Sequence, residues 1–100
     1  MESTIADIKI KAYLSKNLKN WTFDKGAIKR ELKFKNFVDA FSFMTAIALE
    51  AEKMDHHPDW TNVYNTVRII LNTHSAGGVT EKDFKLAEKI DRSYDRYEKK

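Results

Sequence analysis

The densest group of side chains that could move a proton lies in one short stretch near the middle of the chain. His56 and His57 stand side by side before Pro58, the only proline, and Glu52 lies just upstream. The third histidine, His74, precedes a loop that contains two glycines. Imidazole titrates near neutral pH, so a histidine can act as an acid or a base without a cofactor. These residue types therefore indicate acid–base chemistry as one possible function.

Pro58 affects how the two adjacent histidines can be used. Proline disfavours helical geometry at the residue before it, so we expect His57 to be extended and the preceding helix to end by about Met54. Neighbouring side chains on an extended backbone point to opposite sides. We therefore expect His56 and His57 to contact two different parts of a ligand and not to bind one metal ion together.

Each of these features also has a simpler interpretation. A histidine after a helix can serve as a charge partner for the helix C-terminus, and Asp83 can serve as a cap of the last helix. A zinc site of the three histidines with Glu52 or Asp83, as in a metal-dependent hydrolase, has suitable ligand types but lacks the close spacing of familiar zinc motifs. The residues alone leave these alternatives open.

Three segments of the chain are expected to be helices that place these side chains. Each opens like a capping box, with a hydroxyl or amide residue three positions before Asp: Thr4 and Asp7, Asn36 and Asp39, Thr80 and Asp83. After residue 36, one apolar stripe predicts a core-facing helix of about 17 residues: Phe37, Phe41, Met44, Ala48 and Ala51. The last helix carries Phe84, Ala87, Ile90, Tyr94 and Tyr97. A weaker opening helix carries Ile5, Ile8 and Ala12, followed by Leu14 and Leu18.

Two other segments are expected to form β-hairpins. Trp21 and Phe23 alternate with polar residues, residues 24–26 offer a turn, and one face of the next strand carries Ile28, Arg30, Leu32 and Phe34. Residues 62–64 are expected to lead through a turn at 65–66 into a strand over 67–73, which ends at His74 and has Val67, Ile69, Leu71 and Thr73 on one face. This element order predicts a two-layer α+β fold, a four-stranded antiparallel sheet with three helices packed on one face.

Length and composition limit the remaining possibilities. One hundred residues with 42% hydrophobic side chains predict one domain over residues 1–100. Eighteen Lys and Arg alternate with 15 Asp and Glu, which argues against direct nucleic-acid binding. The chain has no cysteine, which excludes disulfides and thiol chemistry. Because no signal peptide or apolar stretch of about 20 residues is found, we expect a cytoplasmic protein without a membrane partner.

Several ordered motifs resemble the pterin-4a-carbinolamine dehydratase family. They are Glu52-Lys53-x-x-His56-His57-Pro58-x-Trp60-x-Asn62-Val63-Tyr64-Asn65-x-Val67, then Thr73-His74, then Gly78-Val79-Thr80-x-x-Asp83 and Leu86-Ala87. The resemblance implies a homodimer or homotetramer that dehydrates 4a-hydroxytetrahydropterin to quinonoid dihydropterin without a metal or redox cofactor. It also implies a functional link to aromatic amino-acid hydroxylases, phenylalanine hydroxylase above all.

The resemblance further implies a role for each site residue. His56 and His74 would act as acid and base, and His57 would bind and orient the pterin. The acidic groups of the catalytic site would be Glu52 and Asp83. The other substrate-binding residues would be Pro58, Trp60 and Thr73. Lys82 stands where some relatives carry Arg, so a point charge would replace a bidentate contact there.

Two expectations concern contacts with other proteins. Vertebrate members of this family bind the dimerisation helix of a homeodomain transcription factor, so a non-catalytic, coactivator-type interaction protein is the alternative to an enzyme. A small domain with a thin core is also expected to bury apolar surface by association. We expect the strand over residues 67–73 to pair with its symmetry mate, and the helix surface around Ile90, Tyr94 and Tyr97 to contact neighbouring subunits.

Overall fold

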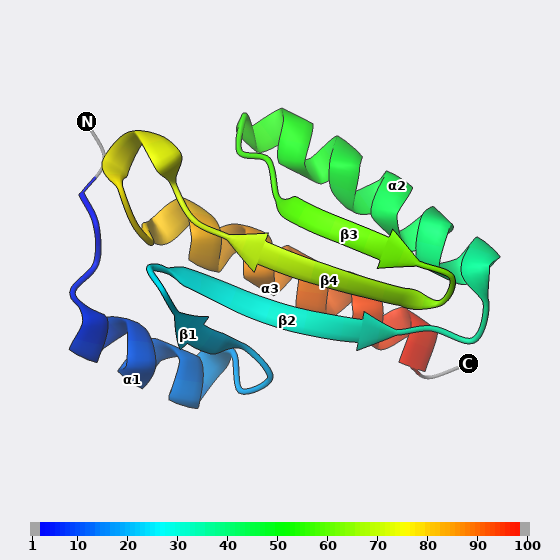
Figure 1. The fold of residues 1–100 in the computed structure, drawn as a ribbon, viewed down its shortest axis with the longest axis horizontal. Coiled ribbons are helices and arrows are strands. Elements are labelled where there is room, and N and C mark those ends of the chain that lie inside the picture. The colour runs from blue at the N-terminus through cyan, green and yellow to red at the C-terminus, as the bar shows by residue number, and fades with distance from the viewer. Residues whose placement is uncertain (1–2, 99–100) are drawn as a thin grey trace.

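The computed structural model describes residues 3–98, which form three helices and a four-stranded antiparallel sheet in two layers (Figure 1). The elements are α1 (Asp7–Asn17), β1 (Thr22–Asp24), β2 (Ala27–Lys33), α2 (Phe37–Met54), β3 (Asp59–Val63), β4 (Thr66–Leu71), the 3₁₀ turn η1 (His74–Ala76) and α3 (Glu81–Glu98). The strand order is β1-β2-β4-β3, and the helices cover one face of the sheet. The predicted α+β fold is therefore confirmed. In this described part of the chain, no helix has the length and apolarity needed to cross a bilayer.

Both hairpins turn through two residues. The first turn is formed by Lys25 and Gly26, which lie within the turn predicted at residues 24–26, and both have positive φ. The second turn lies one residue earlier than predicted, at residues 64–65, and Thr66 already pairs with Val63. The amide of Asn62 explains the shift, because its Nδ2 donates to the carbonyl oxygens of Tyr64 and Thr66 at 3.1 and 2.9 Å and braces the turn from within.

The inner face of the sheet forms one side of the core. β2 and β4 pair so that Ile28 lies opposite Leu71 and Leu32 lies opposite Val67, and all four side chains are buried. The shared faces predicted for these strands are confirmed. β4 lies between β2 and β3, however, so it is not an edge strand. The expectation that residues 67–73 pair with a symmetry mate is therefore wrong, and the edges of this sheet are β1 and β3.

Helix α1 keeps only part of the buried face that the sequence predicted, since Leu14 and, just after the helix, Leu18 are buried as expected. It starts at Asp7 after Ala6, whose side chain makes no cap, so the predicted cap at Thr4 is wrong. The buried side chains are Ile10, Leu14 and Leu18, whereas Ile8 and Ala12 are exposed. The phase of the helix follows from an aromatic contact, because the ring of Tyr13 stacks on that of Phe84 in α3 at 4.1 Å.

Helix α2 has the predicted boundaries but not the predicted inner face. Asn36 caps it, since its Oδ1 accepts from the Asp39 backbone N–H at 2.8 Å. The buried stripe is Ala40, Phe43, Ile47 and Ala51. Of the predicted stripe, Phe37, Phe41 and Ala48 are exposed, Met44 is half-buried and only Ala51 is buried. Apolar residues occupy more than one side of this helix, so periodicity alone did not select the face that packs on Phe34.

Helix α3 buries the predicted residues Phe84, Ala87, Ile90 and Tyr94. Polar contacts fix it against the sheet, because Asp91 Oδ1 accepts from Trp21 Nε1 at 2.8 Å and from Arg30 at 2.5 Å. The hydroxyl of Tyr94 donates to the carbonyl oxygen of Lys33 at 2.6 Å. Ile90 and Tyr94 therefore belong to the core of the subunit, so the prediction that these two contact neighbouring subunits is wrong. Tyr97 is half-buried, and for this residue the contact stays a prediction.

Candidate active site

The end of α2 turns the chain so that His56 points inward. Asp55 adopts the left-handed conformation, with φ of 51°, directly after the last helical residue. Its N–H donates to the carbonyl of Glu52, and the N–H of His56 donates to the carbonyl of Ala51 at 3.0 Å. This pair of hydrogen bonds is a Schellman motif, which usually has glycine in the left-handed position. The helix end thus delivers one histidine into the protein and leaves the next one outside.

His56 forms a buried pair with Asp83, which lies 27 positions away in the sequence. Its Nε2 is 2.6 Å from Asp83 Oδ1. Asp83 is 0% exposed and His56 is 7% exposed, so water cannot screen the contact. A buried carboxylate needs several donors to replace its hydration. The next contacts show how Asp83 obtains them.

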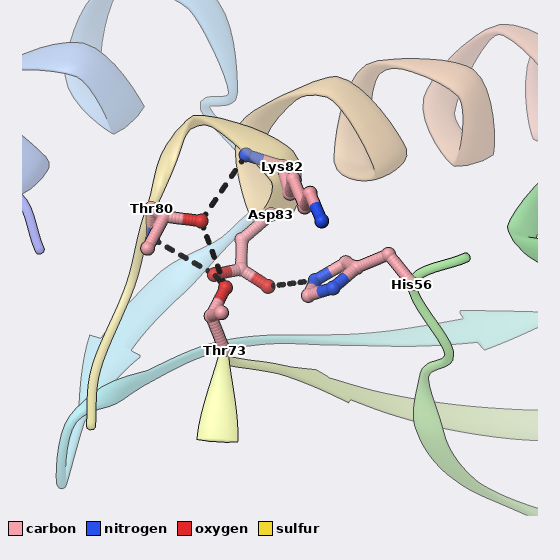
Figure 2. A network of polar contacts seen from close by, with 5 residues as sticks. All are labelled: His56, Thr73, Thr80, Lys82 and Asp83. Carbon is pink, nitrogen blue, oxygen red and sulfur yellow. Dashed lines mark hydrogen bonds and ion pairs between the residues drawn. The ribbon is translucent and has the colours of Figure 1, made fainter. Parts of the chain in front are cut away.

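The first turn of α3 holds Asp83 in place (Figure 2). Asp83 Oδ2 accepts from the backbone N–H of Thr80 and from the hydroxyl of Thr73, both at 2.9 Å. The Thr80 hydroxyl accepts from the backbone N–H of Lys82 at 3.3 Å and lies 2.8 Å from the Thr73 hydroxyl. The predicted capping box of Thr80 and Asp83 is therefore confirmed. The same carboxylate both caps the helix and contacts His56.

The loop over residues 73–80 brings the two threonines together. The backbone N–H of Thr73 donates to the carbonyl of Gly78 at 2.8 Å, which closes the turn formed by η1. Gly77 ends this turn with φ of 77°, a conformation that favours glycine. His74 does not end a strand as predicted, since β4 stops at Leu71 and His74 begins η1. Its side chain is exposed, directly after the buried Thr73.

The second histidine makes a separate, exposed pair. His57 Nε2 lies 2.8 Å from Glu52 Oε1, and both side chains are open to solvent. His56 and His57 thus point to different carboxylates, as the sequence predicted for adjacent residues on extended backbone. Pro58 and Trp60 follow, both half-buried, and Trp60 packs against the core from β3.

The contacts of Asp83 define the hydrogen positions in the buried pair. Asp83 acts as an acceptor, because its Oδ2 receives hydrogens from the Thr80 backbone N–H and from the Thr73 hydroxyl. His56 Nε2 then carries the hydrogen that Oδ1 accepts, and Nδ1 is the nitrogen free to exchange a proton. In residues 3–98, no buried side-chain nitrogen or oxygen lacks a hydrogen-bond partner. Nor do three or more His, Cys, Asp or Glu side chains of that range come together closely enough to hold a metal ion.

The structure brings together His56, Asp83 and Thr73 and places His57 beside Glu52. Thr80 was predicted only as a helix cap, and its contact with Thr73 was not predicted. The sequence indicated that Thr80 lies near Asp83, because Thr80 opens the segment that contains Asp83. The contact between Thr80 and Thr73, however, depends on the loop over residues 73–80, in which Thr73 pairs with Gly78.

Comparison with known proteins identifies the family. A family profile described as pterin 4 alpha carbinolamine dehydratase matches residues 3–93. A protein from Prochlorococcus marinus (strain NATL2A), named "Putative pterin-4-alpha-carbinolamine dehydratase", is 50% identical over 92% of this chain and 96% of its own. A protein of the same name from Mesorhizobium japonicum is 59% identical over 73% of this chain and 76% of its own. The chain belongs to the pterin-4a-carbinolamine dehydratase family, as its motifs predicted.

Two solved structures have similar folds. The crystal structure of a transcriptional coactivator/pterin dehydratase from Brucella melitensis has a TM-score of 0.89 and 42% identity, and the match covers 92% of this chain and 99% of that one. A pterin dehydratase-like protein described as a RuBisCO assembly factor in the alpha-carboxysome has a TM-score of 0.64 and 20% identity over 75% and 89% of the two chains. The second likeness concerns the fold alone.

Proposed function

We propose that this protein catalyses the dehydration of 4a-hydroxytetrahydropterin to quinonoid dihydropterin and water. The observation that carries the proposal is the buried His56–Asp83 pair next to the exposed His57–Glu52 pair. Membership of the family and the two histidine–carboxylate pairs support the same reaction. Residues positioned as acids and bases contribute about 10²- to 10⁴-fold each to such reactions.

The reaction needs one proton to be delivered and another to be removed. The C4a–O bond breaks as the hydroxyl is protonated and leaves as water, and the N5 electron pair forms the new C4a=N5 bond while N5 loses its proton. We assign the acid and base roles to His56 and His74. The Asp83 carboxylate holds the His56 imidazole in one orientation, so that Nδ1 can exchange the proton. Both protons are then accounted for by the chain's own residues.

The exposed pair and its neighbours are assigned to binding. His57, held by Glu52, can donate to or accept from the polar edge of a pterin, because an imidazole offers one donor and one acceptor. Half-buried Pro58 and Trp60 offer apolar surface for the flat ring system. We further propose that the substrate is supplied by an aromatic amino-acid hydroxylase and that recycling takes place in the cytoplasm.

The proposal is tested with chemically generated 4a-hydroxytetrahydropterin, whose disappearance is followed by ultraviolet absorbance with and without the protein. We expect a rate well above the spontaneous one and proportional to protein concentration. The matched control is Ser15→Glu, a change at an exposed residue of α1, a helix to which no candidate site residue belongs, and it should keep full activity. A rate equal to the spontaneous one with folded wild-type protein would reject the proposal.

A second function is favoured by one observation on α2. The exposed side chains of this helix include Phe37, Val38, Phe41 and Leu49, an unusual number of large apolar groups for a free surface. Such a surface fits the alternative of an interaction protein, and the Brucella relative is described as both coactivator and dehydratase. The two functions can be tested separately, because His56→Ala changes the candidate site and leaves the exposed side chains of α2 in place.

A further inference from the structure

We propose that Thr80 is a positioning residue: its hydroxyl starts a relay of hydrogen bonds through Thr73 and Asp83 that fixes which nitrogen of His56 carries the hydrogen. This inference rests on the proposed function, since it assigns that hydrogen position to catalysis. The relay links the start of α3 to the histidine after α2, and its middle member is Thr73, which follows β4.

The direction of each hydrogen bond follows from the donors available. The backbone N–H of Lys82 can only donate, so the Thr80 oxygen accepts from it. Thr73 has a single hydroxyl hydrogen and donates it to Asp83 Oδ2. In the remaining contact, 2.8 Å between the two hydroxyl oxygens, Thr80 must therefore be the donor. All hydrogens point toward the carboxylate.

This polarity acts on Asp83. Hydrogen bonds arranged in one direction polarise one another, so the Thr80 hydroxyl makes the Thr73 hydroxyl a better donor. Oδ2 is thereby occupied by Thr73 and by the Thr80 backbone, and Oδ1 is left to face His56. A carboxylate fixed in this way accepts from Nε2 and disfavours the tautomer with the hydrogen on Nδ1.

Burial makes the relay effective. Thr73, Thr80 and Asp83 are 4%, 2% and 0% exposed. A buried hydroxyl that loses its partner is not compensated by water, and the remaining groups rearrange. Without the Thr80 hydroxyl, Thr73 still donates to Asp83 but no longer accepts a hydrogen bond that polarises it, so its contact with Oδ2 is weaker and holds the carboxylate less firmly.

The test compares two variants of Thr80, one variant of Thr73 and one control. Thr80→Val removes the hydroxyl and keeps the shape, and Thr80→Ser keeps the hydroxyl. Thr66→Val makes the same chemical change in a half-buried threonine of β4 that lies outside the relay. Thr73→Val interrupts the relay one hydrogen bond closer to Asp83, and it replaces Thr80→Val in the test if Thr80→Val does not fold.

The first readout is the tautomer of His56, measured by ¹H–¹⁵N correlation spectra of the imidazole and assigned by comparison with His56→Gln. We expect the wild type, Thr80→Ser and Thr66→Val to show the Nε2–H tautomer. Thr80→Val or Thr73→Val should populate the Nδ1–H form. An unchanged tautomer in both valine variants would overturn the proposal.

The second readout is turnover. Loss of one buried neutral hydrogen bond predicts a kcat about 3- to 10-fold lower for Thr80→Val with KM nearly unchanged, and restored by Thr80→Ser. Equal loss in the valine and serine variants would show that the hydroxyl is not responsible and would reject the relay. If the wild type showed the expected tautomers but no dehydration, the positioning of His56 would be supported and the dehydratase assignment alone would fall.

Discussion

At the scale of single residues, Asp83 joins the stability of the fold to the chemistry of the site. One carboxylate oxygen caps α3 and binds Thr73, and the other faces His56. His57, by contrast, pairs with the exposed Glu52. The two adjacent histidines therefore have different environments, and we expect their substitution to have different kinetic effects.

His74→Ala should lower kcat strongly, by about 10²-fold or more, while His57→Ala should mainly raise KM. An acid or base acts in the transition state, whereas a group that holds the pterin binds ground and transition states alike. Steady-state kinetics over a range of pterin concentrations separates the two effects. A loss confined to kcat in His57→Ala, or to KM in His74→Ala, would reverse these assignments.

At the scale of elements, side-chain contacts hold α1 against α3. Tyr13 of α1 stacks on Phe84 and donates its hydroxyl hydrogen to Glu88. The hydrogen bond to the Glu88 carboxylate, with some burial, raises the pKa of Tyr13 to about 12. The C-terminal end of α2 is also unusual, because Asp55, and not a glycine, adopts the left-handed backbone conformation there.

The Tyr13 contact predicts a loss of stability at alkaline pH. The unfolded chain releases this proton near pH 10, whereas the folded protein keeps it up to about pH 12. Between these values the native state binds more protons, so the free energy of unfolding falls as pH rises. The stabilisation is complete below about pH 10. Urea denaturation at several pH values gives the free energy of unfolding of the wild type and of Tyr13→Phe, and the difference between them measures this stabilisation. A parallel decline in both proteins would contradict this prediction.

Asp55→Gly should stabilise the protein by about 0.5–1 kcal/mol. Glycine accepts the left-handed conformation without steric cost, and removal of the charge relieves repulsion with the C-terminus of α2. Urea denaturation gives the difference in the free energy of unfolding. Asp59→Gly is the control, because Asp59 lies in β3 with negative φ, where glycine should destabilise. Equal destabilisation by both changes would argue against the Schellman motif.

Local signals in the sequence predicted most elements, while long-range packing decided the rest. The caps at Asn36 and Thr80 and the helix end before Pro58 follow from neighbouring residues, and all were predicted. The inner face of α2 depends on which apolar side meets the sheet, which periodicity could not decide. Candidate site residues were chosen from residue types and motifs, but the pairing of His56 with Asp83 requires the packed positions of α2 and α3.

At the scale of the whole molecule, the exposed stripe of α2 is available for association. Phe37 and Phe41 lie in ring contact at 5.7 Å on the surface, and Val38 and Leu49 are exposed on the same helix. Burial of such groups against a second copy would remove apolar area from water. With Ile90 and Tyr94 in the core, this stripe replaces the last helix as the expected subunit contact.

We therefore predict a homodimer or larger assembly for the wild type and a smaller mass for Phe41→Glu, because a two-fold interface contains each substitution twice. Light scattering at micromolar concentration provides the masses. Ser15→Glu places the same charge on the exposed side of α1 and should leave the mass unchanged. A wild-type mass equal to that of one chain would exclude association at that concentration.

The central claim is that the buried His56–Asp83 pair moves a proton during dehydration. The most direct test is the single-turnover rate constant at saturating pterin, compared between the wild type and His56→Ala, because it isolates the chemical step from binding and release. Our account predicts a rate constant about 10²- to 10⁴-fold lower in His56→Ala, with the variant still folded and still binding pterin. A rate constant within about twofold of the wild-type value would contradict it, since no acid or base with a contribution of 10²-fold could then reside at His56.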